Sequence, residues 1–297
     1  MSASIFLYFG TMIGIYALLS LSLNFQYGFA GLINFGHVGF FAIGAYASAI
    51  LSSMGYPIAL GFVVGFIMAG LVGLLIALPT QKLSVHYWAI VTIAIAEVIR
   101  LVALNEAWLT NGSFGIVNIP QPLKGIIAPQ YYPVFYLVLV WLFVLAAYAL
   151  FSLLVRSPFG RILRLIREEE DLALSLGKDV FSYRVKAMAI GAAVAGVAGS
   201  LYAHYITYVS PLDFLPLLTF VVWVMMIVGG RANQLGVLFG TAVIVLFFNS
   251  TRYLKDYIPL DTQTIASLRM VVIGALIMLV IVYRPDGLIP ERKGKVG

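Results

Sequence analysis

The chain has 297 residues, of which 62% are hydrophobic and only 10% are charged, and its mean hydropathy is +1.02. This composition leaves too little polar surface for a water-soluble globule, and several segments reach the ~20 apolar residues that a helix needs to cross a bilayer. The net charge of +6 is dispersed between hydrophobic segments, which argues against a nucleic-acid-binding protein, and the absence of cysteine excludes thiol redox chemistry and thiolate metal sites. The sequence therefore predicts an all-α polytopic membrane protein in which residues 1–297 form a single transmembrane domain.

Apolar segments separated by Gly, Pro and charged residues predict nine membrane spans. Their expected bounds are 5–24, 31–53, 57–78, 85–104, 133–155, 185–206, 214–229, 234–250 and 265–283. No basic stretch precedes the first apolar run, so we expect a retained first helix rather than a cleaved signal. A polar loop rich in Asn, Gly and Pro, from Asn105 to Tyr132, separates the fourth and fifth spans.

One long polar run, Arg156 to Lys186, interrupts the apolar sequence and holds seven of the 18 basic residues and five of the 12 acidic residues. If this run is cytoplasmic, alternation of the spans places thirteen basic residues inside. Only five then lie outside, namely Arg100, Lys124, Arg252, Lys255 and Arg269. Because cytoplasmic loops carry an excess of Lys and Arg, we predict that the N-terminus and the Asn105 to Tyr132 loop are extracytoplasmic and that the C-terminus is cytoplasmic.

Two Gly-containing stretches, Met54 to Gly65 and Gly229 to Gly240, align without a gap. The identical positions are Gly55/Gly230, Leu60/Leu235, Gly61/Gly236 and Gly65/Gly240. In the predicted topology the two copies enter their spans from opposite sides, as in a transporter built from an inverted repeat. Chance similarity between helices rich in small residues is the alternative.

Within the polar run we predict two short helices rather than one. Ser157-Pro158 can start a helix, since the hydroxyl can cap it and proline suits the first turn, and Gly177 is a natural stop. A break near Arg167 would place the acidic residues Glu168 to Asp171 in the first turn of a second helix, beside its free N–H groups. The expected apolar faces comprise Ile162, Leu165 and Ile166 on the first helix, and Leu172, Ala173 and Leu176 on the second.

Such exposed amphipathic helices either lie on anionic lipid or bind a protein. The four consecutive acidic residues from Glu168 to Asp171 would be repelled by anionic lipid, which favours a protein partner. The chain contains no G-x-x-x-x-G-K-[ST] motif. We therefore expect that it does not hydrolyse ATP, and that any ATP-driven motor is a separate polypeptide bound to this run.

Polar residues inside the spans are costly and need a partner or a function. Glu97 has Arg100 one turn later and is expected to form an intramembrane ion pair with it. Asn34 and His37 lie one turn apart in a Gly-rich stretch that can break the helix and free backbone groups for a substrate. The alternative is that both side chains simply bond to a neighbouring helix.

The expected wall of a substrate pathway comprises Asn34, His37, Phe40, Phe41, Thr219 and Trp223. His86 and His204 are expected near helix ends, within reach of water. Because the three histidines are far apart and lack ligand partners at suitable spacing, no metal site is expected. No catalytic set of residues emerges either, so we do not expect an enzyme.

Four blocks, which include SPFGRILRLIREEEDLALSLGKD and IVGGRANQLGVLFGTAV, are similar to blocks of a known family. They extend over Ile15 to Tyr46, His86 to Gly112, Ser157 to Ala187 and Ile227 to Val243. Taken in this order, they resemble the membrane subunits of branched-chain and neutral amino acid ABC importers, and most closely the M-type permease.

The resemblance implies a permease of the bacterial inner membrane that pairs with a homologous H-type subunit. It also implies two cytoplasmic ATPase subunits, which bind ATP and magnesium, and an extracytoplasmic binding protein that delivers the substrate. The loop that maps onto Ser157 to Lys178 would lie in the ATPase cleft, and no additional regulatory domain is expected. The coupling residues expected on this basis are Arg161, Ile162, Arg164, Leu165, Glu168, Asp171, Leu172, Leu176 and Gly177.

The expected substrate is a branched-chain or other neutral amino acid, with urea or another small polar solute as the alternative. A secondary transporter that works alone is the rival class. Such a protein would carry unpaired acidic residues in several spans, whereas this chain offers only Glu97, which has Arg100 beside it.

Overall fold

The computed structural model describes residues 2–78, 85–254 and 287–291, together with single positions between 264 and 283. The predicted ninth span, 265–283, therefore lies largely outside the described residues. So do several basic residues used in the orientation argument, namely Lys82, Lys255, Arg269, Arg284, Arg292, Lys293 and Lys295.

Long helices coincide with the first eight predicted spans. They are α1 (Ser2–Asn24), α2 (His37–Ser53), α3 (Ile58–Ala77), α4 (Val85–Asn105), α6 (Tyr132–Arg156), α9 (Val180–Ile206), α10 (Pro216–Gly229) and α11 (Gln234–Leu254). Among the described residues, five helical segments are long and apolar enough to cross a bilayer: Ser4–Phe29, Ile58–Ala77, Tyr87–Asn105, Tyr132–Arg156 and Val180–Ile206. The apolar parts of α2, α10 and α11 are shorter. The architecture is that of an all-α membrane protein.

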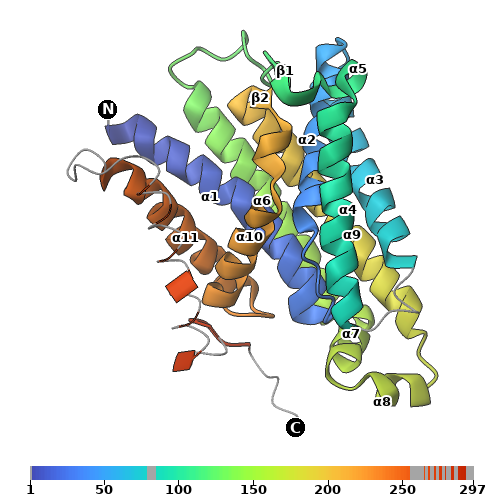
Figure 1. Cartoon of the computed structure of the whole chain (residues 1–297). Coiled ribbons are helices and arrows are strands. Elements are labelled where there is room, and N and C mark those ends of the chain that lie inside the picture. Colours follow the sequence, from blue (N-terminus) through green and yellow to red (C-terminus); the bar gives the residue numbers. More distant parts are fainter. Residues whose placement is uncertain are drawn as a thin grey trace.

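The long helices run alternately up and down the bundle (Figure 1). The N-terminus, the segment between α4 and α6 and the segment between α9 and α10 lie toward the upper end of this view. Two short helices, α7 (Pro158–Glu168) and α8 (Glu170–Ser175), lie at the lower end. The long polar run and the polar Asn105 to Tyr132 loop are therefore at opposite ends of the bundle.

The Asn105 to Tyr132 loop, called the upper loop from its position in Figure 1, is joined to the end of α9 by short elements. These are α5 (Ala107–Thr110), η3 (Gly112–Phe114), β1 (Ile116–Val117), β2 (Tyr208–Val209) and η4 (Pro211–Phe214). Strand β1 pairs antiparallel with β2, with Ile116 opposite Val209. This pairing joins the loop to the segment that follows α9.

His204 corrects one expectation from the sequence, because it is fully buried rather than within reach of water. Its Nδ1 lies 2.6 Å from the carbonyl oxygen of Pro120, and its Nε2 lies 2.8 Å from Ser48 Oγ. Since a carbonyl can only accept, Nδ1 donates and Nε2 accepts from the hydroxyl. The side chain is enclosed because the loop folds back over the end of α9, a long-range contact that no local pattern reveals.

Small residues let α2, α3 and α9 approach one another closely. A Cβ added to Gly44 would collide with the backbone of Gly196, and one added to Gly65 would lie 3.1 Å from the carbonyl oxygen of Gly44. Ser200 Oγ donates to that same carbonyl at 3.0 Å. Close backbone packing of this kind is the main source of helix association in lipid, where burial of apolar side chains provides no driving force.

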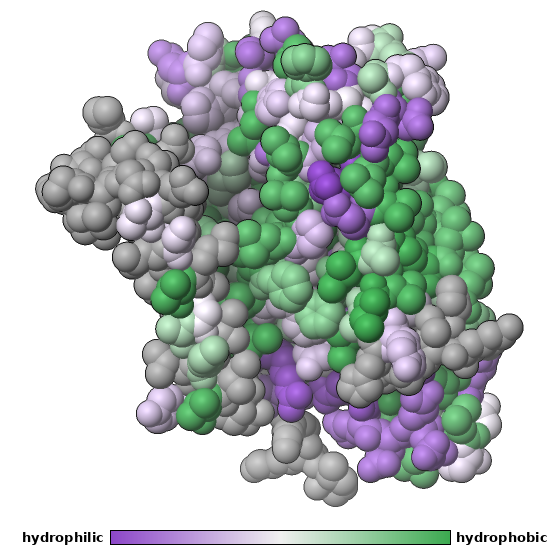
Figure 2. All heavy atoms as spheres, in the orientation of Figure 1, coloured by the Kyte–Doolittle hydropathy of each residue, from purple (hydrophilic) through white to green (hydrophobic). Residues whose placement is uncertain are grey.

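The surface of the bundle is apolar in the middle and polar at both ends (Figure 2). Large hydrophobic side chains on α3, α4 and α6 point outward, among them Leu71, Ile90, Val98, Leu142 and Leu145. A soluble protein would bury such a belt, whereas the hydrocarbon core of a bilayer accommodates it.

Candidate functional site

The first candidate site is a break between α1 and α2. After Asn24 the chain forms a π-helix, η1 (Phe25–Phe29), and no helix is present from residue 30 until α2 starts at His37. Gly31 adopts a φ of +70°, which strongly favours glycine. The predicted break in the helix is therefore present, and it leaves backbone N–H and C=O groups that need other partners.

Side chains from two other helices satisfy these backbone groups. Thr92 Oγ1 accepts from the N–H of Phe35 at 3.1 Å, and Thr219 Oγ1 accepts from the N–H of Val38 at 3.0 Å. The indole Nε1 of Trp223 donates to the carbonyl oxygen of Asn34 at 3.0 Å. Helices α4 and α10 are thereby bonded directly to the break.

Asn34 and His37 themselves form a fully buried polar cluster. Asn34 Nδ2 donates to Gln26 Oε1 at 2.9 Å and lies 3.3 Å from His37 Nδ1. His37 Nε2 lies 2.7 Å from Ser22 Oγ and 3.2 Å from the carbonyl oxygen of Leu19. This pattern fits the tautomer that carries its proton on Nε2, because the Leu19 carbonyl can only accept.

Of the six residues predicted to line a pathway, four converge here: Asn34, His37, Thr219 and Trp223. Phe40 contacts His37 edge-on, with the ring centroids 6.0 Å apart. The ring of Phe41 is turned toward other aromatic rings, those of Tyr202 and Phe214. All six side chains are buried within the single chain. A pathway role for them stays a prediction.

Two further buried amides near the break, Gln26 and Asn24, were not predicted from the sequence. Gln26 Nε2 donates to the carbonyl oxygen of Met188 at 3.0 Å, and Asn24 Oδ1 accepts from the N–H of Ala232 at 2.8 Å. Both residues are amides in an otherwise apolar stretch, which is the signal that could have identified them.

The second candidate site is the polar run, which folds into two helices with a break at Glu169. Pro158 begins α7 and Gly177 adopts a φ of +69°, as their residue types predict. Glu170 and Asp171 occupy the first turn of α8, but Glu168 ends α7 instead. Ser157 does not cap α7, because its Oγ donates to the carbonyl oxygen of Leu154 at 2.6 Å.

The apolar residues of this run divide into an inner and an outer group. Ile166, Ala173 and Val180 form a buried cluster against which Ile162, Leu165 and Tyr183 pack. The exposed fractions of Leu172, Leu174 and Leu176 are 48%, 54% and 57%. The expectation that Ala173 shares a face with Leu172 and Leu176 is therefore wrong, because α8 is short and turns Ala173 toward the bundle.

The charged residues of the run divide in the same way. Arg161, Glu168 and Asp171 are exposed, whereas Arg164 turns inward and donates through Nη2 to the carbonyl oxygen of Val155 at 2.8 Å. Arg184 holds Glu170 through two hydrogen bonds of 2.8 and 2.7 Å, which tie α8 to α9. We use the term outer leucines for the exposed group Leu172, Leu174 and Leu176.

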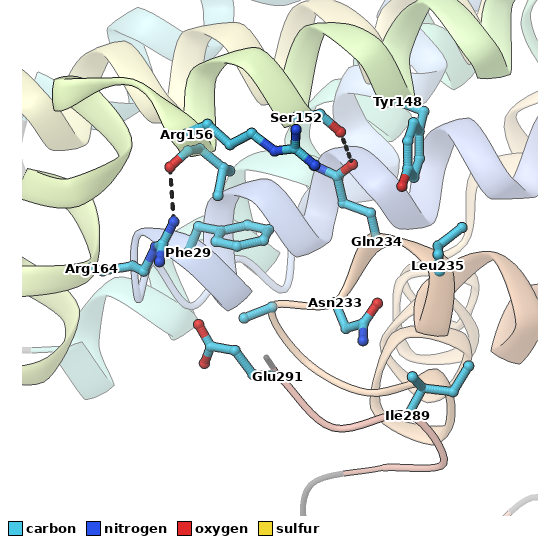
Figure 3. A pocket seen from close by; sticks show the side chains of 12 residues that line it. Phe29, Tyr148, Ser152, Arg156, Arg164, Asn233, Gln234, Leu235, Ile289 and Glu291 are labelled. Atoms are coloured by element: carbon cyan, nitrogen blue, oxygen red, sulfur yellow. Dashed lines mark hydrogen bonds between the residues drawn. The ribbon is translucent and has the colours of Figure 1, made fainter. Parts of the chain in front are cut away.

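A cavity of about 330 Å³ opens beside this run at the lower end of the bundle (Figure 3). Residues of α6, α7 and α11 and of the 287–291 segment line it, including Arg156, Arg164, Gln234 and Glu291. Empty space, rather than close-packed side chains, therefore lies between Arg164 of α7 and the start of α11.

Glu97 and Arg100 form the ion pair that their spacing predicts, with Arg100 Nε donating to Glu97 Oε2 at 2.9 Å. The side chain of Arg100 is 13% exposed and that of Glu97 is 35% exposed. The pair lies within one helix, α4, so it neutralises both charges without joining different elements.

Comparison with known proteins supplies the identity of the chain. Residues 5–281 match the family described as the branched-chain amino acid transport system permease component. The chain belongs to this family. The permease is therefore a transporter component, as the four sequence blocks predicted.

Several curated relatives are M-type proteins. The permease is 32% identical to the high-affinity branched-chain amino acid transport system permease protein LivM of Salmonella typhimurium, an alignment that covers 94% of this chain and 69% of the relative. It is 29% identical to the probable LivM protein of Methanocaldococcus jannaschii, over 94% of this chain and 91% of the relative. The LivH protein of Escherichia coli is 25% identical, over 92% and 91% respectively. The predicted M-type resemblance is confirmed, and no solved structure matches the chain.

Proposed function

We propose that this permease is the M-type membrane subunit of an ABC importer that takes up branched-chain or other neutral amino acids through the cytoplasmic membrane. It would pair with an H-type subunit, receive substrate from an extracytoplasmic binding protein and be driven by two ATPase subunits that bind ATP and magnesium. The observation that carries this proposal is the group of outer leucines, exposed on a charged two-helix segment at one end of an apolar bundle. Apolar anchors surrounded by charges are typical of a protein docking surface.

The proposed topology has nine spans, with the N-terminus outside and the docking segment Arg156 to Lys186 inside. The alternating directions of the described helices are consistent with it (Figure 1). The loop from Asn105 to Tyr132 would then face the binding protein, at the end opposite the outer leucines.

The proposed inverted repeat gains support from how the two similar stretches fold. Gly55 and Gly230, which align in sequence, both adopt positive φ angles, of +88° and +121°. The glycines six residues later are both close to the preceding helix: a Cβ on Gly61 would lie 2.7 Å from Ser48 Oγ, and one on Gly236 would lie 2.5 Å from the carbonyl oxygen of Gly229. These shared glycine positions, on the hairpins α2–α3 and α10–α11 that run in opposite directions in Figure 1, support the proposed repeat.

We further propose that the break between η1 and α2 shapes the wall of the substrate pathway. Because Thr219 and Trp223 bond to this break, a movement of α10 would shift it together with Asn34 and His37. Broken helices near the bilayer midplane are where many transporters place the polar groups of their substrates.

Replacement of outer leucines tests the docking proposal. We expect Leu172→Asp combined with Leu176→Asp to abolish co-purification of ATPase subunits in mild detergent, since two buried carboxylates would be uncompensated at the interface. Leu165 is a poorer target, because it packs inside the segment. Ile126→Asp, at a side chain 82% exposed in the opposite loop, is the matched control and should retain the ATPase subunits.

The wild-type preparation decides between the rival classes. A single polypeptide that transports solute without ATP after reconstitution would contradict the importer proposal and favour a secondary transporter. Uptake of urea, with no competition from leucine or valine, would leave the importer class intact and replace the substrate.

A further inference from the structure

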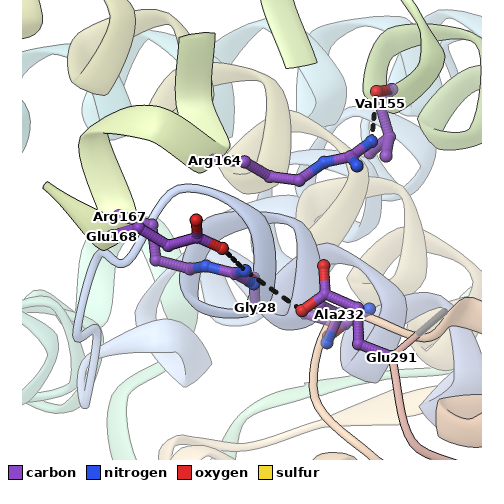
Figure 4. A network of polar contacts seen from close by, with 8 residues as sticks. Gly28, Val155, Arg164, Arg167, Glu168, Ala232 and Glu291 are labelled. Carbon is purple, nitrogen blue, oxygen red and sulfur yellow. Dashed lines mark hydrogen bonds and ion pairs between the residues drawn. The ribbon is translucent and has the colours of Figure 1, made fainter. Parts of the chain in front are cut away.

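Arg167 lies where three separate parts of the chain meet (Figure 4). It belongs to the last turn of α7, and its side chain is only 18% exposed. One guanidinium nitrogen, Nη1, donates to the carbonyl oxygen of Gly28. The other, Nη2, lies 3.0 Å from Glu291 Oε2 and 2.9 Å from Glu168 Oε1. Arg167 is therefore turned away from the outer leucines and toward the bundle.

The first of these contacts leads to the break between α1 and α2. Gly28 belongs to η1, and Gly31 in the unwound stretch is so close to Arg167 that an added Cβ would lie 3.2 Å from Arg167 Cγ. A Cβ on Gly28 would lie 2.7 Å from the backbone nitrogen of Ala232, so η1 also touches the turn between α10 and α11. A displacement of Arg167 would act on this backbone directly.

The second contact leads to the α10–α11 hairpin through the segment 287–291. The N–H groups of Leu288 and Ile289 donate to the carbonyl oxygens of Val228 and Gly229 at 2.9 and 3.1 Å. Asn233 Nδ2 donates to the carbonyl oxygen of Pro290 at 2.9 Å. Glu291 is thus bound to the hairpin, and its ion pair with Arg167 connects that hairpin to the docking segment.

A cavity lies beside Glu291 and Phe29, close to the polar contacts that Arg167 makes with Gly28 and Glu291 (Figure 3). Where α7 faces α11 there is open space of about 330 Å³, so in this region the distance between the two helices is not set by close packing. A guanidinium presents several donors in a rigid plane and can hold a carbonyl and a carboxylate at once.

We propose that Arg167 is the positioning residue that transmits movement of the docking segment to both the broken helix and the α10–α11 hairpin. The proposal rests on the function proposed above, since it requires an ATPase that moves α7 and α8. Docking itself is assigned to the outer leucines, and transmission is assigned to the contacts of Arg167 with Gly28 and Glu291.

The test uses the complete importer, reconstituted in liposomes with its ATPase and binding proteins. The measured quantity is substrate taken up per ATP hydrolysed, with ATPase co-purification as a second readout. We expect Arg167→Ala to retain the ATPase subunits but to lower uptake per ATP about tenfold, as the loss of a charge-assisted contact would. Arg167→Lys keeps the charge but loses the planar fork, and should restore uptake only in part.

Two further variants separate this role from general damage. Glu291→Gln should also lower uptake per ATP, and should add little when combined with Arg167→Ala, because both changes remove the same contact. Arg231→Ala is the matched control, since it removes an exposed arginine beside Ala232 at the same end of the bundle. Its uptake per ATP should equal that of the wild type.

The remaining outcomes contradict either the positioning role of Arg167 or the proposed function. Wild-type coupling in Arg167→Ala would overturn the positioning role, and so would loss of the ATPase subunits, which would place Arg167 in docking. If Arg167→Ala fails to insert, wild-type coupling in both Arg167→Lys and Glu291→Gln would overturn it. Absence of ATPase subunits from the wild-type complex would instead refute the proposed function.

Discussion

Buried polar side chains in this permease form hydrogen bonds with one another and also with the backbone of other elements. Trp223 reaches the carbonyl oxygen of Asn34, Gln26 reaches that of Met188, and Asn24 accepts from Ala232. Each bond joins residues more than a hundred positions apart in the sequence. Because an unpaired polar group inside the bundle is costly, these bonds also specify which helix packs where.

Thr219 gives a direct test of this principle at a single residue. Val38 is the second residue of α2, so its N–H has no partner within the helix, and Thr219 Oγ1 supplies one. Thr219→Val keeps the shape but removes the acceptor, and we expect a loss of about 1–3 kcal/mol of stability. The measurement is the melting temperature of the purified protein in detergent.

Thr219→Ser, which retains the hydroxyl, serves as the control for that substitution. Its melting temperature should lie clearly above that of Thr219→Val. Equal values for the two variants would mean that the hydrogen bond to Val38 contributes nothing measurable.

The upper loop is held by His204 as well as by the two short strands β1 and β2. His204→Phe keeps a ring that can stack on Phe62 but loses the bonds to Pro120 and Ser48. We expect the loop to open more often and trypsin to cleave after the exposed Lys124 about tenfold faster, as the loss of the one buried hydrogen bond that joins His204 to the loop, that to Pro120, implies. Limited proteolysis in detergent measures the rate.

A control for that experiment is Tyr131→Phe, which changes an exposed side chain of the same loop. Its cleavage rate should match that of the wild type. If His204→Phe is cleaved no faster, contacts other than those of His204 hold the loop.

The sequence predicted elements well and their partners poorly. Apolar runs ended by Gly and Pro placed the long helices, and the Gly-rich stretch around Asn34 indicated the break, because both signals are local. Arg167 was identified only as a possible break point, since its partners Gly28 and Glu291 are 139 and 124 residues away. The prediction that the Ser157 hydroxyl caps α7 is wrong, because that hydroxyl donates to the carbonyl oxygen of Leu154 one turn earlier.

The face shown in Figure 2 is polar at both ends, and Figure 1 places α8, which carries the outer leucines, at the end opposite α5 and β1 of the Asn105 to Tyr132 loop. Because the chain contains no cysteine, single cysteines can report on which end faces the cytoplasm. In intact cells, a membrane-impermeant thiol reagent should label Ile126→Cys, whereas Leu174→Cys should be labelled only after the membrane is permeabilised. Both side chains are more than half exposed in the single chain. Because docked ATPase subunits would cover Leu174, the cells express the permease without them, and access of the reagent is then limited by the membrane.

The reverse pattern of labelling would contradict the orientation that the positive charges predict. Labelling of both cysteines in intact cells would contradict the placement of the two ends on opposite sides. An unsubstituted chain, which offers no thiol, gives the background.

The ion pair between Arg167 and Glu291 also has a consequence for biosynthesis. Glu291 emerges from the ribosome 124 residues after Arg167, which at typical rates of synthesis is a delay on the order of 10 s. During that interval α7 and α8 are already outside the ribosome but lack the carboxylate that ties them to the α10–α11 hairpin. A nascent or truncated chain would therefore offer its outer leucines on an untethered segment, and only synthesis through Glu291 completes the connection between the docking segment and the bundle.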